Sequence, residues 1–250
     1  RLGMGCAVVL SRDEWDAIQG NLLTVYLMGA RVKMIDTGDH WNLEQHVFAL
    51  CEELREEGLH PHFIPVSGTT PRSCLGYVQG ALETAGQLEE QGVELDAVYT
   101  PFGTGGIFTA MLLAFREKGI LCPFVGISVN RRLDECMAYH EKWWAPLCTL
   151  LDCDPEQPRE PFEIFYQYIG KAYGDPTEAC LDAILCMAQT EGILLDPVYS
   201  GKMCSGFLDH VEAGRWNSGQ SILLLHSGGV PALFAYHAEM EAHLRKRGLL

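Results

Sequence analysis

The sequence predicts an α/β protein with parallel sheets, crossover helices and two lobes. Short apolar runs without polar alternation recur along the chain, and stretches with helical periodicity separate them. Such runs are typical of strands covered on both faces, as they are in parallel sheets. With 250 residues, 48% of them hydrophobic, the chain is long enough to bury one substantial core or two smaller ones.

The first predicted strand is CAVVL at residues 6–10, and the second is VKMI at residues 32–35. An amphipathic stretch between them predicts a helix. The sequence LEQHVFALCEELREEG then predicts a further helix that ends at Gly58, with an apolar face formed by Val47, Leu50 and Leu54.

Four more apolar runs predict strands: HFIPV at 62–66, DAVYT at 96–100, PFVGISV at 123–129 and ILLLH at 222–226. The acidic, proline-rich run at 152–161 predicts a surface loop. We place the lobe boundary near residues 38–43, so that residues 1–40 form the remainder of a smaller lobe and residues 41–250 form the larger lobe.

Charge and hydropathy narrow the classes of partner. The formal net charge is 18 − 33 = −15, which argues against a nucleic-acid partner because binding to phosphate backbones needs clustered Lys and Arg. The basic cluster RKRG at 245–248 is better explained as the end of a helix, where it complements the dipole. No apolar run approaches the roughly 20 residues that span a bilayer. We expect a cytoplasmic protein without a membrane partner.

The ten cysteines predict neither a zinc site nor a disulfide framework. The chain has no C-x-x-C pair, and the closest two, Cys148 and Cys153, have the wrong spacing for a zinc clip. We expect buried, reduced thiols and no metal, because free cysteine packs as a small hydrophobic residue.

A glycine-rich turn is the first chemical signal. In YTPFGTGGIFTA, residues 99–110, we expect the strand to end at Thr100 and a helix to begin near Ile107. The turn would aim the backbone N–H groups of Gly103, Thr104, Gly105 and Gly106 at one point, which suits a phosphate. The Walker A and Rossmann spacings are both absent. On this stretch alone, a tight turn that needs glycine for backbone reasons explains the pattern equally well.

Other segments carry a resemblance to a known family. They are EGILLDPVYSGKMCSG at 191–206, ILLLHSGGVPALFAYH at 222–237, and IPVSGTT followed by LGYVQGALE. With the glycine turn, they resemble the D-cysteine desulfhydrase and 1-aminocyclopropane-1-carboxylate deaminase family. The resemblance implies the tryptophan-synthase-β-like fold (fold type II), a pyridoxal 5'-phosphate cofactor, and a role for the turn as the seat of the cofactor phosphate in the larger, cofactor-binding lobe.

The resemblance also implies roles for individual residues. Tyr199 in DPVYSGK and Tyr173 in KAYGDP match active-site tyrosines, although a phenol with an ordinary pKa near 10 is a poor base. Ser227 in HSGG and Ser200 match cofactor-binding positions. Without the resemblance, each tyrosine would be better explained as a hydrogen-bonded core aromatic. Ile107 replaces a threonine that is common in the family, and Thr104 offers a substitute hydroxyl.

Ser200 bears on the reaction. In the deaminase branch of the family this position is a glutamate that keeps the pyridine nitrogen protonated. A hydroxyl makes the ring a weaker electron sink, which suits α,β-elimination. We therefore expect a lyase that acts on a small cysteine-like amino acid as a D-cysteine desulfhydrase does, with pyruvate, ammonia and sulfide as products. An L-cysteate sulfo-lyase that releases sulfite, and a non-catalytic partial homologue, are the alternatives.

The family's Schiff-base lysine lies in an Asn-Lys motif that is not present in this sequence, and its Ser-Asn-His motif is not present either. We expect a further N-terminal segment or a complementing chain to supply them. The same segment would cover the edge of the strand at residues 6–10. The resemblance also implies a homodimer.

Overall fold

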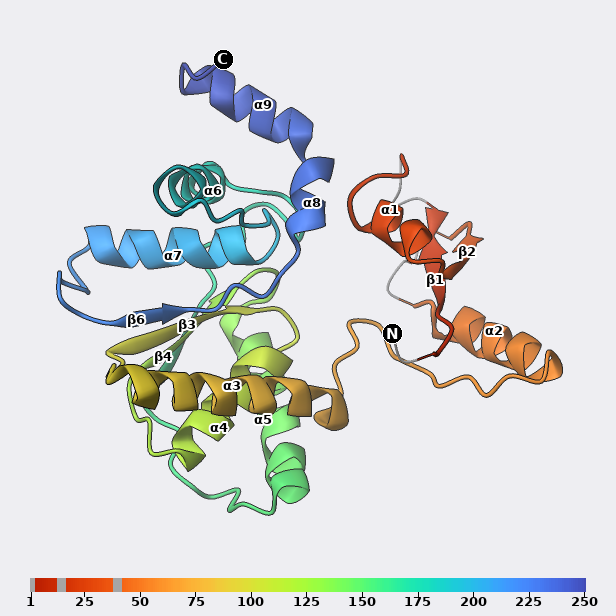
Figure 1. Cartoon of the computed structure of the whole chain (residues 1–250), viewed down its shortest axis with the longest axis horizontal. Helices are drawn as coiled ribbons and strands as arrows, with labels where there is room; N and C mark the ends of the chain where they lie inside the picture. The colour runs from red at the N-terminus through yellow and green to blue at the C-terminus, as the bar shows by residue number, and fades with distance from the viewer. Residues whose placement is uncertain (1–2, 13–16, 38–41) are drawn as a thin grey trace. The chain divides into compact units, whose positions relative to one another are not determined.

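A computed structural model of the chain describes residues 3–12, 17–37 and 42–250, coloured along the sequence in Figure 1. The chain forms two compact units, Arg1–Thr69 and Thr70–Leu250. The expected lobe boundary at residues 40 and 41 falls on residues outside the described part. The division by contacts comes later in the chain, because the helix at 44–56 packs against the first strand.

The first unit contains a parallel pair of strands, β1 (Ala7–Ser11) and β2 (Arg31–Ile35), with Ala7 opposite Arg31. Helix α1 (Gly20–Leu27) connects the two strands, and α2 (Glu44–Glu56) follows. These elements confirm the two predicted strands and both predicted helices. Helix α2 buries the predicted apolar residue Leu50.

The predicted strand at residues 62–66 is wrong. This segment forms no strand, and its apolar side chains Ile64 and Val66 are 67% and 42% exposed. Pro61 and Pro65 carry no N–H group and cannot donate to a ladder, which explains why an apolar run here does not pair.

The second unit has a four-stranded sheet in the order β5-β4-β3-β6, and all its neighbouring strands are parallel, as predicted. The short edge strand β5 was not predicted, because its FEIF sequence alternates weakly and follows a proline-rich loop. The elements are α3 (Pro71–Gln91), β3 (Ala97–Phe102), α4 (Gly106–Glu117), β4 (Phe124–Ser128), α5 (Leu133–Leu151), β5 (Phe162–Phe165), α6 (Glu178–Glu191), α7 (Ser200–Glu212), β6 (Ile222–Leu224), α8 (Val230–Ala235) and α9 (His237–Lys246).

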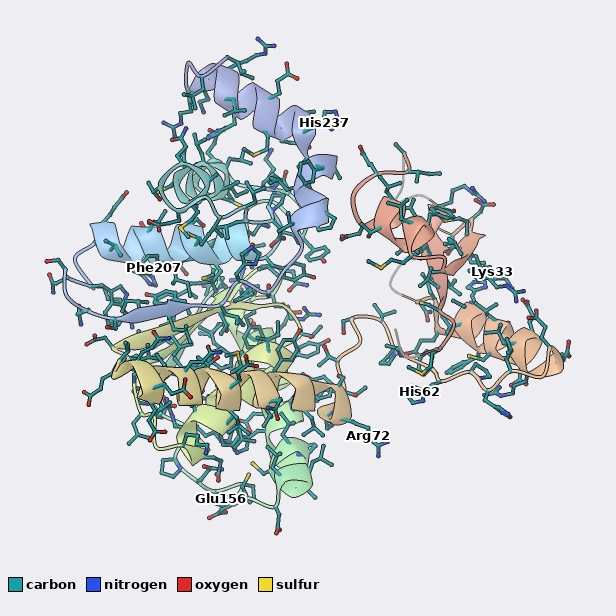
Figure 2. The ribbon with its side chains drawn as sticks, in the orientation of Figure 1. Lys33, His62, Arg72, Glu156, Phe207 and His237 are labelled. Carbon is teal, nitrogen blue, oxygen red and sulfur yellow. The ribbon has the colours of Figure 1, made fainter. Side chains whose placement is uncertain are left out.

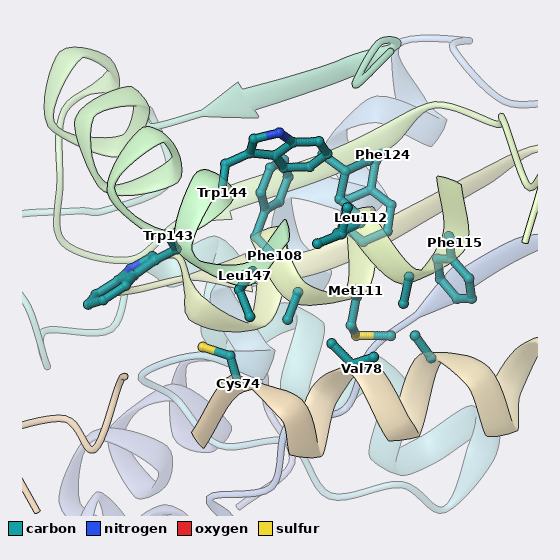
Figure 3. Packing of buried hydrophobic residues seen from close by; sticks show 14 of the residues in the cluster. Cys74, Val78, Phe108, Met111, Leu112, Phe115, Phe124, Trp143, Trp144 and Leu147 are labelled. Carbon is teal, nitrogen blue, oxygen red and sulfur yellow. The ribbon is translucent and has the colours of Figure 1, made fainter. Parts of the chain in front are cut away.

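Helices cover both faces of this sheet (Figure 1). On one face, Met203 and Phe207 of α7 pack against Tyr99 and Ile127, and Phe207 points toward the strands in Figure 2. On the other face, α4 lies between the sheet and α3, and its Phe108, Met111 and Phe115 enter the largest core cluster (Figure 3). This double cover explains the continuous apolar runs of β3 and β4, whose residues are all buried.

The sheet order places a switch point at β3. The chain passes from β3 through α4 to β4 on one side, whereas β6 pairs with β3 on the other side. In open α/β sheets, ligands bind beyond the carboxyl ends of the strands at such a point. The glycine turn lies directly after β3 at this position.

Other sequence predictions concern the surface and the thiols. Residues 152–161 form the predicted loop, and the basic cluster ends α9, where Lys246 pairs with Glu178 at 2.7 Å. All ten cysteines are free, but Cys6 is exposed, contrary to the expectation of burial. Among the described residues, no helix is long and apolar enough to span a membrane, and no group of three or more His, Cys, Asp or Glu residues is arranged to hold a metal.

Candidate active site

The glycine turn at residues 103–106 forms a tight loop between β3 and α4, which is called the glycine cup. Strand β3 extends two residues past the expected Thr100, because Phe102 still pairs with Ser128 of β4, and α4 begins at Gly106. Gly105 has φ +76°, and a Cβ there would lie 2.8 Å from Cζ of Phe102. Only glycine combines that backbone conformation with that close contact. The expected order of strand, glycine turn and helix is therefore confirmed, with shifted ends.

Side chains from α5 and from the turn after β4 hold the back of the cup. Arg131 donates from Nη1 to the carbonyl oxygen of Gly103 at 2.8 Å, and its guanidinium stacks 4.3 Å from the ring centre of Tyr139. Trp143 donates from Nε1 to the carbonyl oxygen of Thr104 at 2.7 Å. Two successive carbonyl groups of the cup are thus anchored on one side.

Tyr199 lies against the front of the cup. It precedes the first residue of α7, and a Cβ at Gly103 would lie 3.4 Å from its Cε1. Its hydroxyl oxygen lies 2.6 Å from the hydroxyl oxygen of Tyr173. Burial, followed by the nearby Tyr173, raises the pKa of Tyr199 well above its ordinary value, so the phenol stays neutral at physiological pH. The structure thus brings together both predicted tyrosines and the cup.

The segment that carries Tyr173 is fastened to two helices. Lys202 of α7 is fully buried, and its Nζ donates to the carbonyl oxygens of Ile169 at 2.6 Å and Ala172 at 3.2 Å. Burial lowers the pKa of Lys202. At the end of α8, Tyr236 donates to the carbonyl oxygen of Gly174 at 2.6 Å. These contacts fix Tyr173 relative to the start of α7.

Ser200 is fully buried behind Tyr199. Its hydroxyl donates to Oδ1 of Asp196 at 2.6 Å and accepts from the Asp196 backbone N–H at 2.9 Å. The Asp196 carboxylate also accepts from the N–H groups of Val198, Tyr199 and Ser200. The Asp196 carboxylate therefore binds the backbone N–H groups at the start of α7, and the hydroxyl proton of Ser200 is committed to that carboxylate.

Ser227 lies in an exposed loop after β6. The β6 ladder aligns Leu224 with Tyr99, so this loop leaves the same edge of the sheet as the cup. His226 organises the loop, because its Nδ1 accepts from the N–H of Gly228 at 3.1 Å and its Nε2 lies 2.9 Å from the carbonyl oxygen of Leu194. No contact in the described structure joins Ser227 to the cup.

Four residues near the cup were missed by the sequence analysis: Tyr77, Arg131, Trp143 and Asp196. Arg131 had a usable signal, because it follows a buried strand adjacent to β3. Burial raises the pKa of Tyr77 of α3, with smaller contributions from Cys74 and then Tyr199, so Tyr77 lies near Tyr199. Trp143 and Tyr77 occupy helix interiors, where sequence alone does not distinguish them from ordinary core residues.

Comparisons with known proteins agree with this geometry. The chain is 33% identical over 245 residues to a D-cysteine desulfhydrase of Serratia proteamaculans, covering 96% of this chain and 73% of the relative. It is 31% identical over 242 residues to a putative 1-aminocyclopropane-1-carboxylate deaminase of Pyrococcus abyssi, covering 96% and 71%.

The crystal structure of an ACC deaminase homologue superposes with a TM-score of 0.83 at 29% identity, covering 97% of this chain and 71% of the other. Threonine deaminase isoform 2 from Solanum lycopersicum shares the fold, with a TM-score of 0.63 at 15% identity over 97% and 67% of the two chains. The family model described as "Pyridoxal-phosphate dependent enzyme" matches residues 1–228. The chain therefore belongs to the pyridoxal-phosphate-dependent enzymes, as the motifs around Tyr199 and the glycine turn predict.

Proposed function

We propose that this protein is a pyridoxal-phosphate-dependent lyase that catalyses α,β-elimination on a cysteine-like amino acid and releases pyruvate, ammonia and sulfide. The observation that carries the proposal is the pair of hydroxyls of Tyr199 and Tyr173, 2.6 Å apart, directly beside the glycine cup. The named D-cysteine desulfhydrase among the relatives supports the choice of substrate class.

The residues of the cup fit the cofactor phosphate. Gly105 avoids a clash with the Phe102 ring because it has no Cβ, and the first turn of α4 presents backbone N–H groups next to the positive end of the helix dipole. Arg131 adds a fixed positive charge at the back. We therefore assign residues 103–106 to the phosphate, and keep Ser227 as a proposed contact because its loop leaves the same sheet edge.

When it is bound, pyridoxal phosphate supplies an electron sink for a substrate carbanion. The chain's own contribution is the tyrosine pair. Because Tyr199 stays a neutral phenol, it is suited to donating a hydrogen bond or a proton to a departing sulfur or to a carboxylate, and unsuited to acting as a base at neutral pH. Tyr173 accepts from or donates to Tyr199 and so fixes the direction of that hydroxyl.

Position 200 favours elimination over ring opening of the cyclopropane substrate. It carries a hydroxyl where the deaminase branch has a carboxylate, and the neighbouring Asp196 carboxylate is occupied by three backbone N–H groups and the Ser200 hydroxyl. No carboxylate side chain at this position would then hold a protonated ring nitrogen, which suits a substrate with a good leaving group. The homodimer that the resemblance implies and the cytoplasmic location expected from the composition remain predictions.

The test is to load the protein, together with the segment or chain expected to supply the Schiff-base lysine, with pyridoxal phosphate and to offer D-cysteine, L-cysteate and 1-aminocyclopropane-1-carboxylate separately. Sulfide with pyruvate from D-cysteine is the expected result. Tyr199→Phe should lower kcat by about 100-fold or more, since it removes a positioned proton donor. Tyr168→Phe, which removes a hydroxyl bound to Asp209 outside the cup, should leave kcat unchanged.

Each alternative has its own outcome. Faster release of sulfite from L-cysteate would reassign the protein as a sulfo-lyase, and efficient formation of 2-oxobutanoate would place it in the deaminase branch. No turnover of any substrate, together with no cofactor retained after borohydride reduction, would indicate a non-catalytic homologue.

A further inference from the structure

Two carbonyl groups of the glycine cup are held by side chains, and the proposed chemistry leaves the role of these two hydrogen bonds unexplained. Trp143 anchors the carbonyl oxygen of Thr104 at 2.7 Å, and Arg131 anchors that of Gly103 at 2.8 Å. Trp143 is 8% exposed, and Arg131 is itself fixed by Asn130 and Tyr139. Both donors therefore hold the turn from a rigid support.

Because the peptide bond is planar, anchoring these two carbonyl groups also fixes the directions of the N–H groups of Thr104 and Gly105. In a planar trans peptide, the C=O of one residue and the N–H of the next point in opposite directions. With the Gly103 carbonyl directed toward Arg131, the N–H of Thr104 points away from the guanidinium. With the Thr104 carbonyl directed toward Trp143, the N–H of Gly105 points away from the indole.

We propose that Trp143 and Arg131 are positioning residues that orient the peptides of the cup so that the N–H groups of Thr104 and Gly105 face the cofactor phosphate. The inference rests on the proposed phosphate seat. Neither side chain needs to touch the cofactor. Gly105 is held at φ +76° with the Phe102 ring against it, so the turn has one preferred state. Loss of an anchor would allow the neighbouring peptides to rotate away from that state.

Trp144 provides a matched control in the neighbouring position. It also donates its indole N–H to a backbone carbonyl, that of Pro155 at 2.9 Å, in the loop at 152–161. Figure 3 shows the two indoles leaving α5 in different directions. Trp143→Phe and Trp144→Phe therefore delete the same chemical group from the same helix, and only the first deletes it from the cup.

The measurement is equilibrium binding of pyridoxine phosphate and of pyridoxine, two ligands that differ in the phosphate and lack the aldehyde that reacts with lysine. The ratio of the two dissociation constants reports the phosphate alone, and partial unfolding affects both constants equally. Trp143→Phe should reduce the phosphate preference by about 3- to 10-fold, the usual effect of one hydrogen bond, while Trp144→Phe should leave it at the wild-type value.

Arg131→Met is an independent second variant. It should reduce the preference by about 10-fold or more, because a charged donor is lost, and it should flatten the dependence of the preference on salt. Trp143→Phe should keep the wild-type salt dependence.

The outcomes separate the two proposals. Equal affinity of the wild-type protein for both ligands would overturn the phosphate seat itself. A wild-type preference that Trp143→Phe and Trp144→Phe reduce equally, or that neither reduces, would overturn the positioning role. If Trp143→Phe binds neither ligand, Arg131→Met decides the question. An unchanged ratio of the two dissociation constants and an unchanged salt dependence in that variant would overturn the positioning role.

Discussion

Two glycine loops join a strand to a helix in the second unit, and they differ in what holds them. The loop at residues 103–105 follows a six-residue strand that is wholly buried and precedes a twelve-residue helix. The loop at residues 225–229 follows a three-residue, partly buried strand, lies mostly exposed and precedes a six-residue helix. Side chains from elsewhere in the fold anchor the carbonyls of the first loop, whereas His226 within the second loop binds its Gly228 N–H.

The comparison shows that a strand–glycine–helix pattern has its peptide groups held in a fixed orientation only where side chains from elsewhere in the fold bind them. The first loop has a longer helix behind it, a cation beside it and one positive φ, at Gly105. The second loop has positive φ at both Gly228 and Gly229, and Gly229 packs against Asp196. We expect substitutions in the first loop to be the more costly ones.

The largest effect is expected for Gly105→Ala. The new Cβ would combine the strain of φ +76° with a 2.8 Å contact to the Phe102 ring, and we expect a loss of about 4 kcal/mol in the free energy of unfolding. Gly228→Ala has the strain, at φ +95°, but nothing lies within 4 Å of its Cβ, so about 1–2 kcal/mol is expected. Urea unfolding of both variants measures the difference, and equal losses would remove the contrast between the loops.

Asp196→Asn should come next, because this carboxylate is the point where α7 and the second loop meet. It accepts four hydrogen bonds near the start of α7, and a Cβ at Gly229 would lie 2.9 Å from its Cγ. An amide cannot accept all four, and we expect a loss of about 3 kcal/mol. Asp209→Asn weakens only the hydrogen bond from the Tyr168 hydroxyl, so it should lower the free energy of unfolding by less than about 1 kcal/mol in the same measurement.

A pH effect on stability is expected from the buried histidine behind the first loop. His140 lies fully buried under α4, with Nδ1 2.9 Å from Oγ1 of Thr109, and burial lowers its pKa from 6.5 to about 4. The folded state therefore binds fewer protons than the unfolded state between these values, so stability is present above pH 6.5 and is lost as pH falls toward 4.

Between pH 7 and pH 5, the lowered pKa of His140 should remove about 2 kcal/mol of stability. His140→Leu should show a smaller difference between the two pH values, whatever its stability at pH 7. An undiminished difference in that variant would assign the acid sensitivity to other groups.

The smallest effect is expected for His226→Ala at neutral pH. The variant loses a contact to the Leu194 carbonyl and one to the Gly228 N–H, both at an exposed position where water replaces them. About 1 kcal/mol or less is expected in urea unfolding. A loss as large as that of Gly105→Ala would show that the second loop is as strongly specified as the first.

The sequence by itself determined the parallel α/β fold and the order of strand, glycine turn and helix around residues 103–106, whereas Tyr173 and Tyr199 were singled out by the resemblance to the family. Buried parallel strands need continuous apolar runs, and positive φ next to a ring needs glycine, so local residue choice records these features directly. Where that link is weak, the prediction was wrong or missing. The prolines around Ile64 prevented a strand despite its apolar neighbours, and the short edge strand β5 left no clear pattern.

Only the tertiary structure decided how the site is supported. Thr104 and Trp143 are 39 positions apart, and Ile169 and Lys202 are 33 apart, so no local pattern records that they meet. Packing also decides the partner of the Ser200 hydroxyl, which the resemblance places at a cofactor-binding position and which donates to Asp196. A hydrogen bond from a side chain to a distant carbonyl needs only a donor of the right length, and many residues qualify until the fold brings one of them there.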